Sequence, residues 1–517
     1  MHRRISVVPL FAAITLAACS PDAIAPAKAP LSPKFSMGAS QESGSYIVLT
    51  DRTLSADGVA ARVAAVGGTL MSYHAGTGLA VVSGVSQSGA SDLALSGVGK
   101  VQADFAVAPD APSAATEADA SDIANVSIQS QTNPAGAGRF NFQWNMRLIN
   151  APAAWTAGKL GSSGVTVAII DTGLDYDAPD LNGLVDLSRS KSFMNHYVFG
   201  RQDDTTTVAD EYTPIVPSDD AIVGFFPGRN LVTDLNGHGT NVATQVSSKA
   251  AALAGVTSRT TLIGVKVLGA NGYGAFSDIL NGVLWAADHG ADVANMSLGG
   301  GFSKSGNGDA LEAINLVFNY AKEKGMAIVV AAGNSGINLH YIGNSFSTYC
   351  DAPHVICVAA VGPRLATTSG DEPAYYTNFG KNNVDIAAPG GNQDAANGFT
   401  RSRWPWSPPA PAPLTGNDAA SWVWSYCAKQ TIVIQKAADG IHGDLFVTAC
   451  LAGNRLTGYI GTSQAAPHVP GLAALLAAEP GYKGRPEKIK QQIQRSADTI
   501  NRDFGRGRIN VGHALGL

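Results

Sequence analysis

Residues 165–175 read VTVAIIDTGLD, an apolar run that ends on an aspartate, Asp171. Five similar apolar runs follow along the chain: TLIGVKVL at 261–268, ADVANMSL at 291–298, MAIVVAAG at 326–333, VICVAAVG at 355–362 and VDIAAPG at 384–390. Segments of helical character separate several of these runs. Near-continuous apolar strands that alternate with helices are typical of a parallel sheet buried on both faces. We therefore predict an α/β, three-layer sandwich with a mainly parallel central sheet over residues 141–517.

Two stretches interrupt this alternation and are predicted to be surface insertions. Residues 187–233 are rich in Asp, and residues 391–460 contain the segment WPWSPP that begins at Trp404. The acidic stretch is interpreted as a solvated face, with a cation site as the alternative. The Trp/Pro stretch could be a recognition lid or could pack on the sheet.

A smaller α+β unit is predicted upstream, at residues 45–108. Its pattern gives the order β-α-β-β-α-β, and its last strand is expected at Lys100–Val107. Residues 109–140 are rich in Ala, Ser, Asp and Pro and are predicted to be a linker.

The first 18 residues have the character of an export signal. A basic start, HRR, precedes an apolar stretch from Ile5 to Ala18 that is too short to span a bilayer stably. The string LAACS resembles a bacterial lipobox, so we expect a signal peptide over 1–18 and a lipid on Cys19; ordinary cleavage beside an incidental cysteine is the alternative. Residues 19–44 are expected to be a flexible tether. These features predict a protein that is secreted or lipid-anchored at the bacterial cell envelope.

Composition narrows the classes of partner. The chain has 517 residues, a formal net charge of −5 and 45% apolar residues, which argues against wholesale disorder and against nucleic acid as the main partner. We expect a monomer.

If Cys19 carries lipid, an even set of four cysteines remains, and in an exported chain such a set suggests two disulfides. Nearest-neighbour pairing would join Cys350 to Cys357 and Cys427 to Cys450; the other two connectivities, or four reduced thiols, are the alternatives. No cysteine or histidine spacing suggests zinc.

Four polar residues stand where strands end or helices begin. Asp171 and Asn334 follow apolar strands, His238 opens a helix expected to reach about Ala252, and Ser463 lies at the start of a very apolar helix. Together they supply what acyl transfer requires: a Ser nucleophile, an imidazole base, a carboxylate that orients the imidazole, and an amide donor for the oxyanion. Each residue alone could equally be a helix cap or a satisfied polar group.

The strings AIIDTGLD, NGHGT, AAGNSG and GTSQAAPHV resemble the subtilisin family of serine proteases, in its order Asp, His, Ser. The resemblance implies a subtilisin-like fold and a Ser-His-Asp endopeptidase that acts on proteins or peptides. It also implies that the small upstream unit is a ferredoxin-like propeptide, an intramolecular inhibitor that is cut off at a site within about 105–140. Two segments would hold substrate: Gly272, Tyr273 and Gly274, and Ser297, Leu298 and Gly299. Phe276 would line a more distant subsite.

The sequence also departs from the family pattern. Asn241 replaces a usual His, and Gln464 replaces a usual Met. A family calcium site would use Asp180, but the loop after the helix of His238 lacks the usual Asn ligand. We therefore expect no required cofactor and no metal at the active site, with structural calcium possible but unsupported by that loop. A catalytically silent binding scaffold and an esterase are the competing functions.

Overall fold

The computed structural model describes residues 44–107, 114–119, 132–194, 218–270, 272–299, 301–364, 367–392, 422–430, 432–436, 443–447 and 455–517. The predicted signal peptide, the lipidation residue Cys19 and the tether up to residue 43 lie outside the described residues. So do Cys450 and the segment beginning at Trp404.

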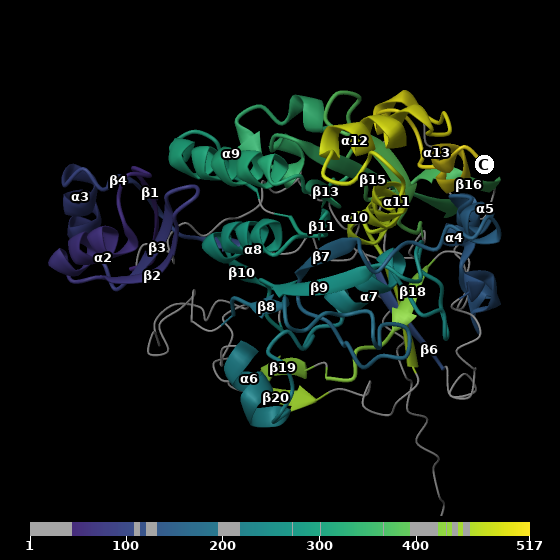
Figure 1. Ribbon diagram of the computed structural model, residues 1–517, viewed down its shortest axis with the longest axis horizontal. Helices are drawn as coiled ribbons and strands as arrows, with labels where there is room; N and C mark the ends of the chain where they lie inside the picture. The colour runs from purple at the N-terminus through teal and green to yellow at the C-terminus, as the bar shows by residue number, and fades with distance from the viewer. Residues whose placement is uncertain are drawn as a thin grey trace, which may run out of the picture. The chain divides into compact units, whose positions relative to one another are not determined.

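A parallel sheet forms the centre of the fold (Figure 1). Its strands lie in the order β16-β15-β13-β11-β7-β9-β8, with β17 also paired to β15. Their bounds are β7 Thr166–Asp171, β8 Lys191–Ser192, β9 Thr261–Lys266, β11 Val293–Met296, β13 Ala327–Ala331, β15 Val355–Arg364, β16 Thr367–Pro373 and β17 Ile386–Pro389. Every pairing is parallel except that of β15 with β16. The predicted mainly parallel sheet is confirmed.

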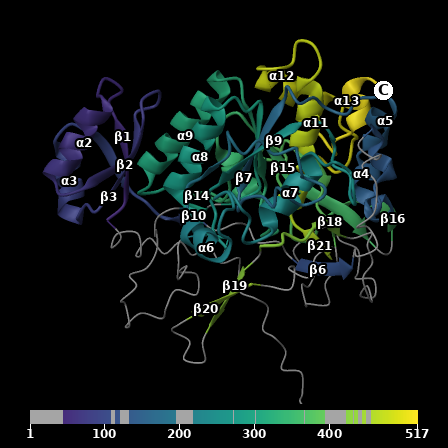
Figure 2. The ribbon, with the colours of Figure 1, turned by 60° about the horizontal axis from the view of Figure 1, so that its bottom comes forward.

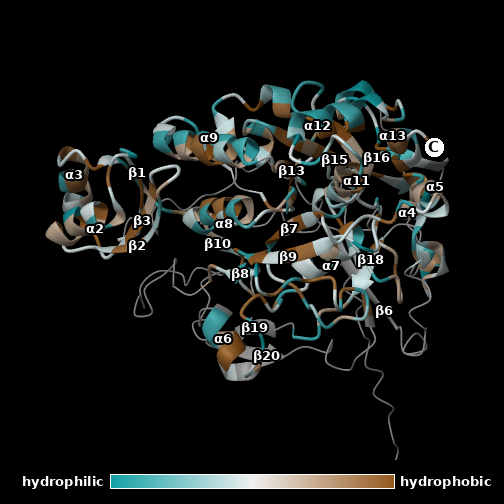
Figure 3. Cartoon of the chain, in the orientation of Figure 1, coloured by the Kyte–Doolittle hydropathy of each residue, from teal (hydrophilic) through white to brown (hydrophobic). Residues whose placement is uncertain are grey.

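Side chains of the sheet are buried on both faces. In β7, Val167 and Ile169 belong to one hydrophobic cluster, whereas Ala168 and Ile170 belong to the other. This alternation follows from the two-residue period of a strand. Figure 3 shows the apolar colour of the central strands between helices whose outer surfaces are more polar.

Helices cover both faces of the sheet. Helices α8 (Phe276–Asp288) and α9 (Gly308–Glu323) share a cluster with Ala168 and Ile170, and helices α7 (His238–Val246) and α11 (His468–Ala477) share the opposite cluster. The three layers are therefore helices, sheet and helices. The remaining helices of this unit, within the described residues, are α4 Trp144–Leu148, α5 Ala151–Thr156, α6 Ser218–Phe225, α10 Thr462–Ala465, α12 Pro486–Arg495 and α13 Val511–Leu515.

The helix that begins at His238 is shorter than predicted: α7 ends at Val246, not near Ala252. Ser247 is extended, with φ −146° and ψ 131°, and the backbone of Ser248 donates to the Thr257 carbonyl at 3.0 Å. The hydroxyl of Ser248 also donates to the Leu253 carbonyl, at 2.5 Å. These bonds offer the chain an alternative to helix, so the residues after α7 form a loop.

The upstream unit contains the six elements in the predicted order. They are β1 Tyr46–Thr50, α2 Ala56–Ala65, β2 Thr69–His74, β3 Leu79–Ser83, α3 Gln87–Leu95 and β4 Gly99–Ala103. The four strands form one antiparallel sheet in the order β2-β3-β1-β4. The unit has its own hydrophobic cluster, which includes Val48, Val63 and Leu93.

The last predicted strand of that unit, Lys100–Val107, is in fact two strands. β4 ends at Ala103, and β5 (Ala106–Val107) pairs antiparallel with β10 (Gly274–Ala275) of the other unit. The break falls at Asp104, whose carboxylate accepts from the backbone of Phe105 at 2.9 Å and of Ser277 at 3.1 Å. The chain therefore leaves its own sheet to join a neighbouring one.

Three smaller sheets complete the described structure. Strands β18 (Val423–Tyr426), β21 (Arg455–Ile460) and β6 (Ala114–Asp119) form an antiparallel group with β21 in the middle (Figure 2). The other two are pairs: β12 Phe302–Ser303 with β14 Ser345–Phe346, and β19 Ile432–Lys436 with β20 Gly443–Val447. Among the described residues, no helix is long and apolar enough to cross a membrane.

Candidate active site

Asp171 and His238 are brought together by β7 and α7. Asp171 is the last residue of β7, and His238 is the first residue of α7, after Gly237 with φ 101°. The Asp171 Oδ1 lies 2.8 Å from the His238 Nδ1. This is the carboxylate–imidazole arrangement that holds the ring in one tautomer and leaves Nε2 to act as a base.

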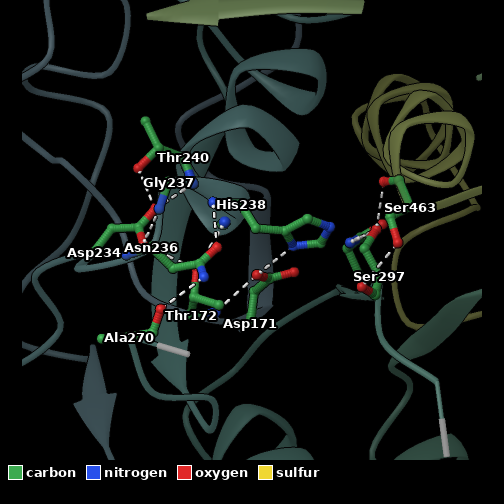
Figure 4. A network of polar contacts seen from close by, with 12 residues as sticks. Asp171, Thr172, Asp234, Asn236, Gly237, His238, Thr240, Ala270, Ser297 and Ser463 are labelled. Carbon is green, nitrogen blue, oxygen red and sulfur yellow. Dashed lines mark hydrogen bonds and ion pairs between the residues drawn. The ribbon is translucent and has the colours of Figure 1, made fainter. Parts of the chain in front are cut away.

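The loop that carries His238 is held by a residue the sequence interpretation missed, Asp234. Its carboxylate accepts from the backbone of Gly237 at 2.8 Å and of Thr240 at 2.9 Å, and from the Thr172 hydroxyl at 2.9 Å. Thr172 directly follows Asp171, so Asp234 connects the segment that carries Asp171 to the segment that carries His238 (Figure 4). The Asp-Leu-Asn-Gly run before His238 was the available signal, because Asp and Asn commonly bond backbone amides at turns.

The surroundings of His238 change its basicity in two opposed ways. Burial lowers the pKa of the imidazole, but the charge of Asp171 and its hydrogen bond raise it by more, and the pKa lies above its usual value. The positive form of the ring is therefore stabilised by Asp171, as a general base requires when it accepts a proton.

Ser463 lies in α10, directly before the apolar helix α11, and is fully buried. Figure 4 shows the ring of His238 between Asp171 and the helix that carries Ser463. The hydroxyl of Ser463 donates to the Ser297 carbonyl at 3.2 Å, and the His238 Nε2 has no hydrogen-bond partner among the described residues. The expected bond between Ser463 and His238 is thus not made here. Such bonds are often long or unformed without substrate, and a rotation of the Ser463 side chain can redirect its hydroxyl.

Asn334 lies three residues after β13, and Thr462 fixes its side-chain amide. The Oδ1 of Asn334 accepts from the Thr462 backbone at 2.8 Å and from the Thr462 hydroxyl at 2.9 Å. The amide NH₂ must therefore point the opposite way. Because Thr462 directly precedes Ser463, the amide is positioned next to Ser463.

The first predicted substrate segment borders β10. Tyr273 accepts from the Gly269 backbone at 2.7 Å, and Gly274 begins β10. A Cβ on Gly274 would lie 1.9 Å from the Val267 carbonyl oxygen, so a larger residue does not fit there. Gly272 has φ 82°, which favours glycine. The edge of β10 is occupied by β5.

The second predicted segment, Ser297–Leu298–Gly299, follows β11 and is not itself a strand. Ser297 and Ser463 are joined by two hydrogen bonds: the Ser463 hydroxyl donates to the Ser297 carbonyl, and the Ser297 hydroxyl donates to the Ser463 carbonyl at 2.8 Å. Leu298 is fully buried in the cluster that contains Phe276. The segment thus connects Ser463 to the apolar region beside β10.

The two departures from the family pattern lie close to these residues. Asn241, in α7, donates to the Val423 carbonyl at 3.2 Å and to the Ser425 hydroxyl at 3.1 Å, so it joins the helix of His238 to β18. Gln464 is buried next to Ser463, and its side-chain amide has no hydrogen-bond partner among the described residues.

One predicted disulfide is present. Cys350 and Cys357 are bonded, which ties a short turn to β15. Cys427 is also disulfide-bonded, whereas Cys450 lies outside the described residues.

The described residues contain no cluster of three or more His, Cys, Asp or Glu side chains that could hold a metal. At the position of the family calcium site, the Asp180 carboxylate accepts from the backbone N–H groups of Ala252 at 3.0 Å and Leu253 at 3.1 Å. Burial raises the pKa of Asp180 to about 7. N–H donors around a carboxylate do not fit a cation, which needs oxygen ligands.

Comparison with known proteins identifies the family of this chain. Residues 162–507 match the subtilase family. The chain is 30% identical over 381 residues to a thermophilic serine proteinase of Bacillus sp. (strain AK1), covering 72% of this chain and 67% of that one. It is 28% identical over 380 residues to thermitase of Thermoactinomyces vulgaris, covering 72% and 95%.

Solved structures show the same fold. The epidermin leader peptide processing serine protease of Staphylococcus aureus superimposes with a TM-score of 0.62 at 20% identity, covering 92% of this chain and 98% of that one. Fervidolysin of Fervidobacterium pennivorans gives 0.58 at 22% identity, covering 92% and 61%. The subtilisin-like fold is therefore confirmed, and the chain belongs to the subtilase family of serine proteases.

Proposed function

We propose that this protease is an endopeptidase made as an autoprocessed zymogen, with a triad of Asp171, His238 and Ser463. The observation that carries the proposal is the 2.8 Å bond between Asp171 and His238, with the ring directed to the helix that bears Ser463. These three groups come from three distant parts of the chain, and together they are of the types that acyl transfer needs.

The mechanism follows from these positions. When a peptide binds, the Ser463 hydroxyl leaves the Ser297 carbonyl and gives its proton to the His238 Nε2 as its oxygen attacks the scissile carbonyl. Asp171 stabilises the imidazolium that forms. The Asn334 amide and the Ser463 backbone N–H donate to the oxyanion. His238 then protonates the leaving amine, and water hydrolyses the acyl-enzyme by the reverse sequence of proton transfers.

We further propose that residues 45–108 inhibit the enzyme until they are removed. Two observations support this role. β5 occupies the edge of β10, where the family binds substrate, and the ring of Phe105 stacks on that of Phe276 at 4.5 Å between centroids. An inhibitor that pairs like a substrate excludes other peptides from the same edge.

Export belongs to the same proposal. A signal peptide over 1–18 and lipid on Cys19 would place the zymogen at the bacterial cell envelope. Because Cys19 lies upstream of residues 45–108, the maturation cut would separate the enzyme from its anchor unless the two pieces stay associated.

The test compares the exported protein with Ser463→Ala and with a matched control, Ser163→Ala, at an exposed serine. Each protein is treated with a serine-directed fluorophosphonate, and its intact mass is measured. We expect the parent and Ser163→Ala to lose their N-terminal residues and gain one adduct, while Ser463→Ala stays at the length left by signal cleavage and unlabelled. If the parent also stays uncut and unlabelled, the proposal fails and the silent binding scaffold is favoured.

A further inference from the structure

A chain of buried side-chain hydrogen bonds joins the helix of His238 to the segment of Ser463. It consists of Gln245 in α7, Asn145 in α4 and His468, the first residue of α11, which are 0%, 1% and 0% exposed. The Asn145 Nδ2 donates to the Gln245 Oε1 at 3.0 Å and lies 2.9 Å from the His468 Nε2. Figures 1 and 2 show α4, α7 and α11 side by side. The mechanism proposed above uses none of these three side chains.

A backbone carbonyl fixes each end of this chain of bonds. The Gln245 Nε2 donates to the Trp424 carbonyl of β18 at 2.8 Å, and the His468 Nδ1 lies 3.2 Å from the Ala465 carbonyl. Because a carbonyl can only accept, Gln245 must present its Oε1 to Asn145, and His468 must carry its proton on Nδ1. Burial lowers the pKa of His468 to about 4, so the ring is neutral near pH 7 and its Nε2 can accept from Asn145. The bonds therefore have one set of directions in which all of them are made.

The two ends of the network lie on the segments that carry the catalytic groups. Gln245 follows His238 by seven residues, about two turns, so both lie on the same face of α7. Ala465 is the last residue of α10, the short helix that contains Ser463. No hydrogen bond joins His238 to Ser463 in this structure, so their separation depends on how α7 and α10 are held.

We propose that these three side chains are positioning residues: they hold α7 and α10 at the separation that lets His238 accept the proton of Ser463. The inference rests on the proposed endopeptidase function and adds to it residues that touch neither substrate nor the reacting atoms. A buried polar group that loses its partner is costly, and each bond here has its partners in one arrangement only. The network therefore resists small displacements of the two helices relative to each other.

The experiment compares Gln245→Met with a matched control, Gln143→Met, in the full chain after export and processing. Gln143 is 1% exposed, and its amide makes two hydrogen bonds to the backbone of Ala254, both at 2.7 Å. It lies two residues before Asn145, but its bonds reach the loop after α7 and not the segment of Ser463. Each substitution keeps the length of the side chain and removes comparable buried bonds, so only the link between α7 and α10 differs.

Two measurements separate positioning from stability. Fluorophosphonate counts the active sites, and steady-state kinetics with a chromogenic peptide give kcat per site and KM. Denaturant titration gives the free energy of unfolding, which both substitutions should lower. We expect Gln245→Met to lower kcat at least about tenfold with KM within about twofold of the parent, because a small misplacement of reacting groups slows the chemical step strongly. Gln143→Met should keep kcat within about twofold.

Equal kcat values for Gln245→Met and the parent would overturn the inference. An equal loss of kcat in Gln245→Met and Gln143→Met would overturn it too, because the loss would then be a general effect of destabilisation. If Gln245→Met does not fold, Gln245→Asn, which is shorter by one methylene and still polar, is compared with Gln143→Asn under the same criteria. If the parent is neither labelled by fluorophosphonate nor able to cleave the peptide, the proposed function itself has failed, and this inference fails with it.

Discussion

Phe105 is the side chain by which the inhibitory role of the upstream unit can be tested most directly. It is 1% exposed, and its ring stacks on Phe276 at 4.5 Å between centroids and meets Phe302 edge-on at 5.5 Å. Both partners belong to the catalytic unit. Phe105 is absent from the upstream unit's own cluster, so its loss should weaken the association and leave that unit folded.

The size of the expected change in the inhibition constant follows from the burial of Phe105. Truncation of a fully buried Phe to Ala removes about 3–5 kcal/mol, which includes the contacts between rings. If about 3 kcal/mol of this acts on the association, Phe105→Ala raises the inhibition constant by about 100-fold. Leu95→Ala is the control, because Leu95 is an apolar residue of the same unit that is 85% exposed.

The assay adds the upstream unit, parental or substituted, to processed enzyme and measures the inhibition constant with a chromogenic peptide. Circular dichroism checks that the substituted unit is folded. An inhibition constant for Phe105→Ala within about threefold of the parental value, with the unit folded, would refute the conclusion that Phe105 holds the upstream unit on the catalytic unit. A threefold change corresponds to well under 1 kcal/mol.

Four further outcomes are expected. Asp171→Asn should lower kcat by about 10⁴ at neutral pH, because the imidazole loses its orienting charge, and steady-state kinetics should show little change in KM. Burial raises the pKa of Asp104 to about 6 despite its bonds to Ser277, so the bound unit favours the protonated carboxyl; the inhibition constant should be smallest below about pH 4, rise as pH passes through 6 and then level off, and Asp104→Asn should flatten this profile. Cys357→Ser removes the bond to Cys350 and should lower the free energy of unfolding by about 2.5 kcal/mol, measured by denaturant titration. Asp180→Ala leaves two buried N–H groups without their acceptor and should lower the free energy of unfolding by about 2–4 kcal/mol, whereas a chelator should leave the parental melting temperature unchanged.

The sequence predicts the scaffold well because burial leaves a strong periodic signal. The run that ends at Asp171 is apolar on both faces, and this reflects the helices that cover β7 on each side. The end of α7 was harder to predict: residues 247–252 are compatible with helix by composition, but Ser248 bonds to the carbonyls of Thr257 and Leu253, outside the helix. Tertiary contacts there override local preference.

The site is predicted by residue type but not by its finer geometry. The flanking glycines and strand ends indicate Asp171, His238 and Ser463. The direction of the Ser463 hydroxyl depends on a rotamer, and that of the Asn334 amide on Thr462, which no periodic pattern encodes. Asp234 was missed because the side chain of an aspartate in a turn usually accepts hydrogen bonds only from the backbone of that same turn.

The pairings of β5 with β10 and of β6 with β21 could not be predicted from the sequence either. Backbone hydrogen bonds do not depend on side chains, so a strand that joins a distant edge needs no particular sequence. This property also raises a question of selectivity, because an edge that accepts β5 accepts other extended chains.

The contacts of the upstream unit away from the edge of β10 give an answer. In the upstream unit, His74 Nε2 lies 2.9 Å from the Asp288 carboxylate. The Ser72 hydroxyl accepts from the Asn281 side chain at 3.0 Å. His74 and Ser72 belong to β2, so these two bonds join β2 to α8. Lys100 pairs with Glu312 of α9. These contacts would remain after the proposed cut downstream of residues 45–108, whereas a cleaved substrate would keep only its paired strand. Under the proposed function, the upstream unit and a substrate can therefore use the same edge of β10 and still differ in how long they stay bound, because only the upstream unit makes these further contacts.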